Sequence, residues 1–129
     1  MAMSHEVQPD GVAPPAANYA HAVLTDGATR WLHTSGVVPN RNDGTTPDGI
    51  GEQARVVWAN IGATLAAVQM GPTHVVSVTT YVVAGEDLKP VMAARDEFLG
   101  GHRAASTLVT VAALAQPRWL MEVAIVAAA

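Results

Sequence analysis

The sequence predicts a single α+β domain in which a mixed β-sheet carries two helices on one face. A chain of 129 residues that is 50% hydrophobic and 14% charged is long enough for one core and too apolar to be disordered. Its segments read as two strands, a helix, a strand, a helix and two strands, which is typical of α+β sheets. Because each predicted strand carries consecutive apolar residues, both sheet faces must be covered, and the second cover must come from another subunit. A homo-oligomer is therefore expected.

The first third of the chain is predicted to be a lead-in, a hairpin and a long loop. Residues 1–17 are rich in proline and form an extended lead-in with a short strand near Val7, and residues 18–129 form the single domain. The β-rich segments HAVLT and TRWLHTSG flank Asp26-Gly27, a dipeptide that favours a tight hairpin turn. Residues 37–51 are dense in Pro, Gly, Asn and Asp, which predicts the longest loop of the domain.

The rest of the chain alternates helical and strand patterns. Apolar residues recur with the spacing of one helix stripe between Gly51 and Met70, where Gly-Pro follows. The β-branched segment HVVSVTTYVV, residues 74–83, predicts a strand. Glu86-Asp87 then offers an N-terminal cap for a second helix that ends at Leu99 before two glycines. The final strands are residues 106–114 and 119–127, joined by a short turn.

Composition excludes several classes of function. Without cysteine the chain has no disulfide, thiolate nucleophile or cysteine-bound metal. A formal net charge of -4 with scattered basic residues argues against nucleic acid as a partner. The five histidines lack the spacing of a metal site, and no phosphate-binding glycine loop or serine-hydrolase motif is present. No segment is apolar enough to span a bilayer. We therefore expect a cytoplasmic protein with no metal, no cofactor, no membrane contact and a small-molecule ligand.

Glu122 is anomalous on physical grounds. It is the only acidic residue within the last thirty and lies in the middle of the strand segment WLMEVAIVA. An ionised carboxylate in a strand is costly unless it is paired, hydrogen-bonded or at a wet site. It is either a general base or water-positioning group in a pocket, or a structural carboxylate bound to backbone N–H groups or to an arginine. The sequence leaves both interpretations open.

Six segments occur in an order that is similar to one known family. They are NYAHAV (18–23), TSGVVP (34–39), EQARVVWANIGATLAAV (52–68), HVVSVTTYVV (74–83), EDLKPVMAARDEFLG (86–100) and STLVTVAALAQPRWLMEVAIVA (106–127). Together they resemble the Rid family of reactive-intermediate (enamine/imine) deaminases, also called the YjgF type. The resemblance extends from about Pro14 to Ala127. It implies a chorismate-mutase-like subunit that assembles into a trimeric barrel, with helices outside and ligand clefts between neighbouring subunits.

The resemblance also implies a set of site residues. In active deaminases of this family a glutamate of the last strand holds the water that attacks the imine carbon, which releases ammonia and a keto acid. Tyr19, Ser35, Gly36 and Glu122 match positions of that site. The implied catalytic residue is Glu122, and the other three are implied substrate-binding residues.

Other positions depart from the family pattern. The family's carboxylate-binding arginine falls on Ser106, its following strand position, often a cysteine, on Leu108, and the asparagine of the second helix region on Met92. Arg103 lies three residues before Ser106 and could replace the arginine only if its loop folds back toward the cleft. Thr107 or Ser106 could serve as a neutral hydrogen-bond partner. Without the carboxylate-binding arginine, the sequence does not support an amino-acid-derived enamine as the substrate.

Three functions remain open at this point. The first is hydrolytic deamination of an imine, enamine or related small molecule, with water positioned by Glu122. The second is a non-catalytic small-molecule-binding or regulatory trimer of the same fold, since fold does not fix function. The third is the endoribonuclease or translation-inhibitor role attached to some relatives, which the negative net charge opposes.

Overall fold

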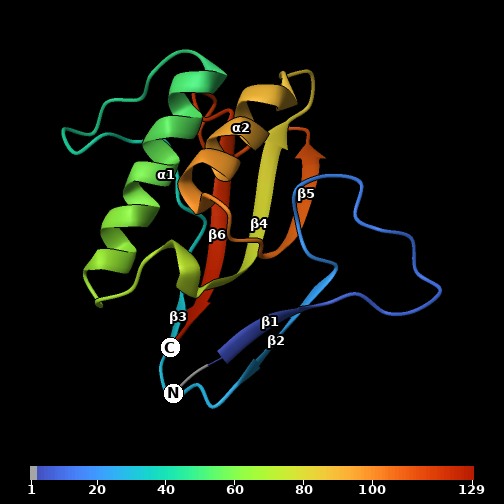
Figure 1. The fold of residues 1–129 in the computed structure, drawn as a ribbon. Coiled ribbons are helices and arrows are strands. Elements are labelled where there is room, and N and C mark those ends of the chain that lie inside the picture. Colours follow the sequence, from blue (N-terminus) through green and yellow to red (C-terminus); the bar gives the residue numbers. More distant parts are fainter. Residues whose placement is uncertain (1–2) are drawn as a thin grey trace.

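The computed structural model describes residues 3–129 and folds them into two helices and six strands (Figure 1). The elements are β1 (Met3–Val7), β2 (Ala22–Asp26), β3 (Trp31–His33), α1 (Ile50–Ala66), a 3₁₀ turn (Pro72–His74), β4 (Val75–Val83), α2 (Leu88–Leu99), β5 (Ala105–Val111) and β6 (Met121–Ala128).

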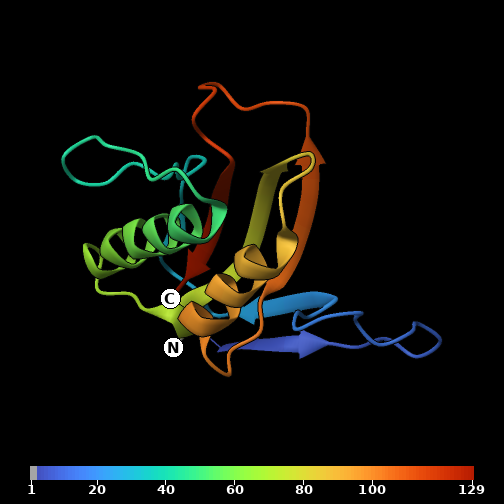
Figure 2. The ribbon, with the colours of Figure 1, turned by 90° about the horizontal axis from the view of Figure 1, so that it is seen from above.

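The main sheet has four strands in the order β3-β6-β4-β5. Strand β5 runs parallel to β4, whereas β6 is antiparallel to both β4 and β3. Both helices pack on the same face of this sheet (Figures 1 and 2). The predicted α+β architecture, with a mixed sheet and two helices on one face, is confirmed.

Alternation along β6 separates a helix-covered face of the sheet from an open face. Met121, Val123 and Ile125 are buried in the core that α1 and α2 cover. Glu122 lies between them in sequence and therefore points to the opposite face. Its cross-strand partner there is Tyr81 of β4. The open face thus carries the carboxylate that the sequence singled out.

The predicted hairpin around Asp26-Gly27 is wrong. Strand β2 pairs with β1 in a separate two-stranded ribbon, and β3 pairs with β6 instead. The chain turns at Gly27, whose φ is +72°, but Thr29 and Arg30 then donate backbone hydrogen bonds to Ala129 at the end of the chain. Pairing with distant strands therefore overrides the local turn signal. The strand expected near Val7 is present as β1.

The remaining elements follow the sequence pattern closely. Helix α1 ends at Ala66, earlier than the apolar stripe suggests, and Gln69 adopts a φ of +56° beyond it. Helix α2 starts as predicted, because the Asp87 carboxylate accepts a hydrogen bond from the Lys89 backbone N–H at 3.0 Å. The last two strands are not neighbours, since β4 lies between β5 and β6.

The long loop between β3 and α1 is held to the turn before β6 by a fully buried amide, Gln53. Its Nε2 donates to the carbonyls of Pro47 at 2.8 Å and Arg118 at 2.9 Å. Its Oε1 accepts from the Leu120 N–H at 2.8 Å. One side chain of α1 therefore fixes both segments that flank the Glu122 region.

Local hydrogen bonds also order the tip of this loop. The Thr45 hydroxyl donates to the Asp43 carboxylate at 2.7 Å, and the Thr45 backbone N–H donates to it at 3.0 Å. These two bonds lower the pKa of the Asp43 carboxyl below its usual value.

Replacing Gln53 by leucine is expected to destabilise the protein. The change removes one buried hydrogen bond, to the Pro47 carbonyl, and two partly buried ones, to the Arg118 carbonyl and from the Leu120 N–H. A buried group left without its partner costs about 1–3 kcal/mol. We expect a loss of roughly 2–5 kcal/mol in the free energy of unfolding, measured by urea denaturation at fixed protein concentration. The control is Gln116→Leu on the exposed turn, where the expected change is within about 0.5 kcal/mol. Equal stability of the two variants would contradict the role of Gln53 in holding the loop to the turn before β6.

Candidate functional site

The Glu122 carboxylate lies directly against the backbone of Gly36. A Cβ atom built on Gly36 would fall 1.6 Å from Glu122 Oε2 and 2.8 Å from Cδ. No side chain other than hydrogen therefore fits at position 36 while the carboxylate keeps this place. Among residues 3–129, no side-chain hydrogen bond or ion pair engages the carboxylate. Glu122 is thus held by packing on the open face of the sheet, with its oxygens available.

The segment before Gly36 is tied to β6 by backbone pairing. The Thr34 N–H donates to the Ile125 carbonyl at 3.0 Å, and the Thr34 hydroxyl accepts from the Ile125 N–H at 2.9 Å. Val37 and Val123 exchange hydrogen bonds of 2.7 and 3.1 Å across an isolated antiparallel bridge. These bonds place Gly36 beside Glu122 and leave Ser35 exposed next to it. Ser35, Gly36 and Glu122, predicted to share a site, are therefore neighbours.

A second group of predicted residues lines one cavity of about 210 Å³ at the β5 edge of the sheet. A backbone hydrogen bond of 3.0 Å from Ala20 to Ala104 and a bridge from Ala20 to Ala105 dock the preceding chain segment against the start of β5. This docking brings Tyr19 to the same cavity as Ser106. The cavity is lined by Ala17, Tyr19, Met92, Arg95, Ser106 and Leu108.

Arg95 is the member of this cavity that sequence reasoning missed. It is 6% exposed, and its Nη1 lies 3.4 Å from the Ser106 hydroxyl oxygen. A signal was present, because Arg95 lies on the buried stripe of α2 between Val91 and Leu99 at a spacing of four residues. A charged residue on the buried stripe of a helix indicates a specific role, just as a charged residue in an apolar strand does for Glu122.

Arg103 and Thr107 lie outside this cavity. Arg103 donates a hydrogen bond to the Tyr19 carbonyl, and its Nε lies 3.4 Å from Glu6 Oε1 of β1. The guanidinium of Arg103 thus holds the N-terminal ribbon to the chain before β5. Thr107 is opposite Thr79 of β4, so its side chain points to the open face, away from Ser106.

The two groups of site residues lie on opposite faces of the sheet within one chain. Ser106 is opposite Val78, whose side chain is buried beneath the helices. Glu122 is opposite Tyr81, and Tyr81 is opposite Val109 on the open face. A single chain therefore does not bring Glu122 and Ser106 into one cleft.

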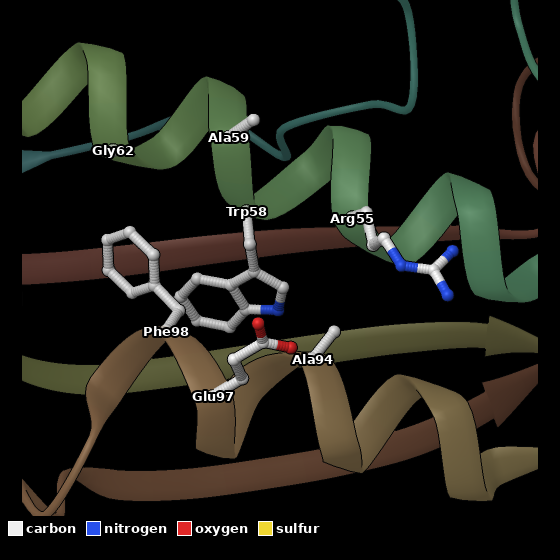
Figure 3. A pocket seen from close by; sticks show the side chains of 7 residues that line it. All are labelled: Arg55, Trp58, Ala59, Gly62, Ala94, Glu97 and Phe98. Carbon is white, nitrogen blue, oxygen red and sulfur yellow. The ribbon is translucent and has the colours of Figure 1, made fainter.

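A larger cavity lies elsewhere, between the two helices (Figure 3). It measures about 520 Å³, and small residues of both helices leave this space above the stacked rings of Trp58 and Phe98, whose centroids are 5.1 Å apart. Arg55 at its rim is directed away from the aromatic pair and is bound to Glu52. This cavity contains none of the residues that the sequence analysis selected, and we assign it no chemistry.

Comparison with known proteins identifies the family. The family model described as endoribonuclease L-PSP matches residues 11–129. The chain belongs to this family. The Rid, or YjgF-type, resemblance drawn from the six segments is thereby confirmed. Among curated proteins, none matches the chain.

Solved structures of family members share the fold over nearly the full length. A Rid-family protein of unknown function, YyfB from Yersinia pestis, is 26% identical with a TM-score of 0.86 and 98% coverage of both chains. A putative endoribonuclease from Thermotoga maritima is also 26% identical, with a TM-score of 0.73 and 98% coverage of both chains. A YjgF-family protein from Neisseria meningitidis is 26% identical, with a TM-score of 0.68 and coverage of 88% and 89%. The likeness covers every element that positions the two groups of site residues.

The described residues contain neither a metal-binding cluster nor a membrane-spanning helix. Across residues 3–129, no three His, Asp or Glu side chains come close enough to hold a metal ion together. Neither helix in the described part of the chain has the length and apolar character needed to cross a membrane.

Proposed function

We propose that this Rid-family protein hydrolyses imines, enamines or related small molecules at clefts between subunits, with water positioned by Glu122. The observation that carries the proposal is the Glu122 carboxylate, which is packed against Gly36, faces the open side of the sheet and, among residues 3–129, is not bound to an arginine. Backbone groups of residues 35 and 36 adjoin it. A carboxylate in such a place can orient a water molecule and accept its proton.

The proposed reaction needs no group beyond these. Glu122 accepts a proton from water as the water oxygen bonds to the C=N carbon, and it passes this proton to the imine nitrogen, which gives a carbinolamine. Glu122 then takes the hydroxyl proton of the carbinolamine as the C=O bond forms and the C–N bond breaks, and it delivers that proton to the departing nitrogen. Imine and water thus give a carbonyl compound and ammonia, and Glu122 ends as a carboxylate.

Assembly would bring the two groups of site residues together. The open face exposes apolar side chains, including Val109, which is 41% exposed, and Trp31, which is 52% exposed. Covering this face with other copies of the chain removes apolar surface from water. It also allows Glu122 of one subunit to face the Ser106 cavity of the next.

A homotrimer is therefore expected in solution. Three subunits of 13.4 kDa give a mass of about 40 kDa. Light scattering coupled to size exclusion should report that mass across the micromolar concentration range. A stable monomer would contradict both the covered face and the shared cleft.

A second candidate is a binding or regulatory trimer without strong catalysis. It is favoured by Ser106, which is neutral where the family resemblance places an arginine. The structure of TdcF from Escherichia coli, which is 19% identical, contains bound serine. Endoribonuclease activity is the third candidate and is favoured by the family description and by the name of the Thermotoga maritima neighbour. A net charge of -4 opposes RNA binding.

Ammonia release tests the proposal. Imines are generated in the assay by an amino-acid oxidase, which gives carboxylated imines, and by an amine oxidase, which gives uncharged ones. We expect the wild type to accelerate ammonia release from at least one class. Absence of acceleration together with tight ligand binding would favour the second candidate. Gain of activity only in Ser106→Arg would show that the scaffold is competent and that its natural ligand is different.

A further inference from the structure

The cavity at the β5 edge contains one charged side chain, and it is buried. Of the six residues that line the cavity, only Arg95 is ionisable at neutral pH, and its side chain is 7% exposed. Burial of a guanidinium is costly unless its N–H groups find partners. Its placement therefore requires a reason in the folded protein or in its ligand.

The partners of Arg95 occupy only one edge of the guanidinium. Nε and Nη2 each lie 3.0 Å from the same Asp96 carboxylate oxygen. Asp96 is 38% exposed, so this carboxylate lies toward solvent. The Nη1 edge has a single long contact of 3.4 Å, to the hydroxyl oxygen of Ser106. The edge beside Ser106 thus keeps donor capacity, and the cavity is closer to the positive charge than to its counter-ion.

We propose that Arg95 is a specificity-determining residue that binds an anionic group of the ligand, a carboxylate, in the cavity shared with Ser106 and Tyr19. This inference rests on the proposed function and names the ligand class at that site. The Nη1 group donates to one carboxylate oxygen, and the Ser106 hydroxyl, released from its long contact, donates to the other. A charge-assisted bond of this kind contributes on the order of tenfold to a hundredfold in affinity.

The test compares pyruvate with pyruvamide, a neutral compound of the same shape. Binding to the trimeric wild type is measured by titration calorimetry and by ligand-observed NMR. We expect pyruvate to bind at least tenfold more tightly, and Arg95→Met to remove this preference while pyruvamide affinity and trimer mass persist. The matched control is Arg55→Met, which removes an exposed helical arginine that is also paired with a carboxylate. Equal affinity of wild type for the two compounds, or no detectable binding of pyruvate, would overturn the inference.

A second variant tests the same inference in the opposite direction and keeps the arginine. Asp96→Asn retains the side-chain shape but removes the charge that competes for the guanidinium. We expect pyruvate affinity to rise several-fold in this variant, with pyruvamide unchanged. A fall in pyruvate affinity, or no change, would overturn the role of Arg95 even if Arg95→Met does not fold.

Failure of this inference and failure of the proposed function give different results. Ammonia release from uncharged imines without a preference for pyruvate overturns the role of Arg95 and supports the hydrolase. A preference for pyruvate that depends on Arg95, without ammonia release from any imine, supports the anion site and overturns the hydrolase.

Discussion

Glu122→Gln is expected to reduce imine hydrolysis to a small residual rate while the oligomeric mass and the melting temperature stay unchanged. Glutamine has the same shape and still accepts a hydrogen bond, but it does not take up a proton from water. Loss of a general base lowers kcat by about 10²–10⁴-fold. Because the carboxylate has no salt-bridge partner among residues 3–129, its neutralisation should leave stability within about 0.5 kcal/mol.

The matched control is Glu97→Gln, on the exposed surface of α2. It changes the net charge by the same amount and should leave ammonia release at the wild-type rate. Retention of activity in Glu122→Gln would remove the basis of the proposed reaction. Unfolding or dissociation of that variant would assign Glu122 a structural role instead.

The parts of the fold predicted correctly are those specified by local chemistry. The apolar stripe of α1 and the Asp87 cap of α2 depend on residues that are close in sequence, so periodicity identifies them. The segment that became β4 is rich in β-branched residues, which favour a strand, and its burial alternates between the face under the helices and the half-buried open face.

Strand pairing could not be read in the same way. Asp26-Gly27 is a strong turn signal, yet β2 and β3 join different sheets because each has a better partner far away in the chain. Parallel pairing of β5 with β4 likewise depends on the crossover through α2 and leaves no local mark in the sequence.

The candidate site was predicted only in part, because contacts between distant segments decide which residues share it. Glu122 attracted notice because a charge in an apolar strand is visible in the sequence alone. Arg95 is the helical counterpart, but a helix tolerates arginine at many positions, so only the tertiary structure shows that its guanidinium reaches Ser106. The separation of Glu122 and Ser106 on opposite sheet faces is a property of register, which periodicity does not give.

Gly36→Ala is expected to slow hydrolysis by displacing Glu122 rather than by unfolding the protein. The new methyl group would take the place of Glu122 Oε2, only 1.6 Å away, and the carboxylate at the end of a flexible side chain must swing aside. Activity should fall by at least about tenfold, because a misplaced catalytic group loses its orientation. The melting temperature should change little, since Gly36 does not have a positive φ.

A double variant distinguishes this mechanism from a general effect of the substitution. If Gly36→Ala acts through Glu122, adding it to Glu122→Gln causes little further loss of activity, because both changes remove the same interaction. Gly49→Ala is the matched control: Gly49 precedes α1 in an extended conformation and a Cβ there meets nothing within 4 Å, so its activity should be that of the wild type. Full activity in Gly36→Ala would mean that the carboxylate works from another position, and an additive loss in the double variant would mean that Gly36 acts independently of Glu122.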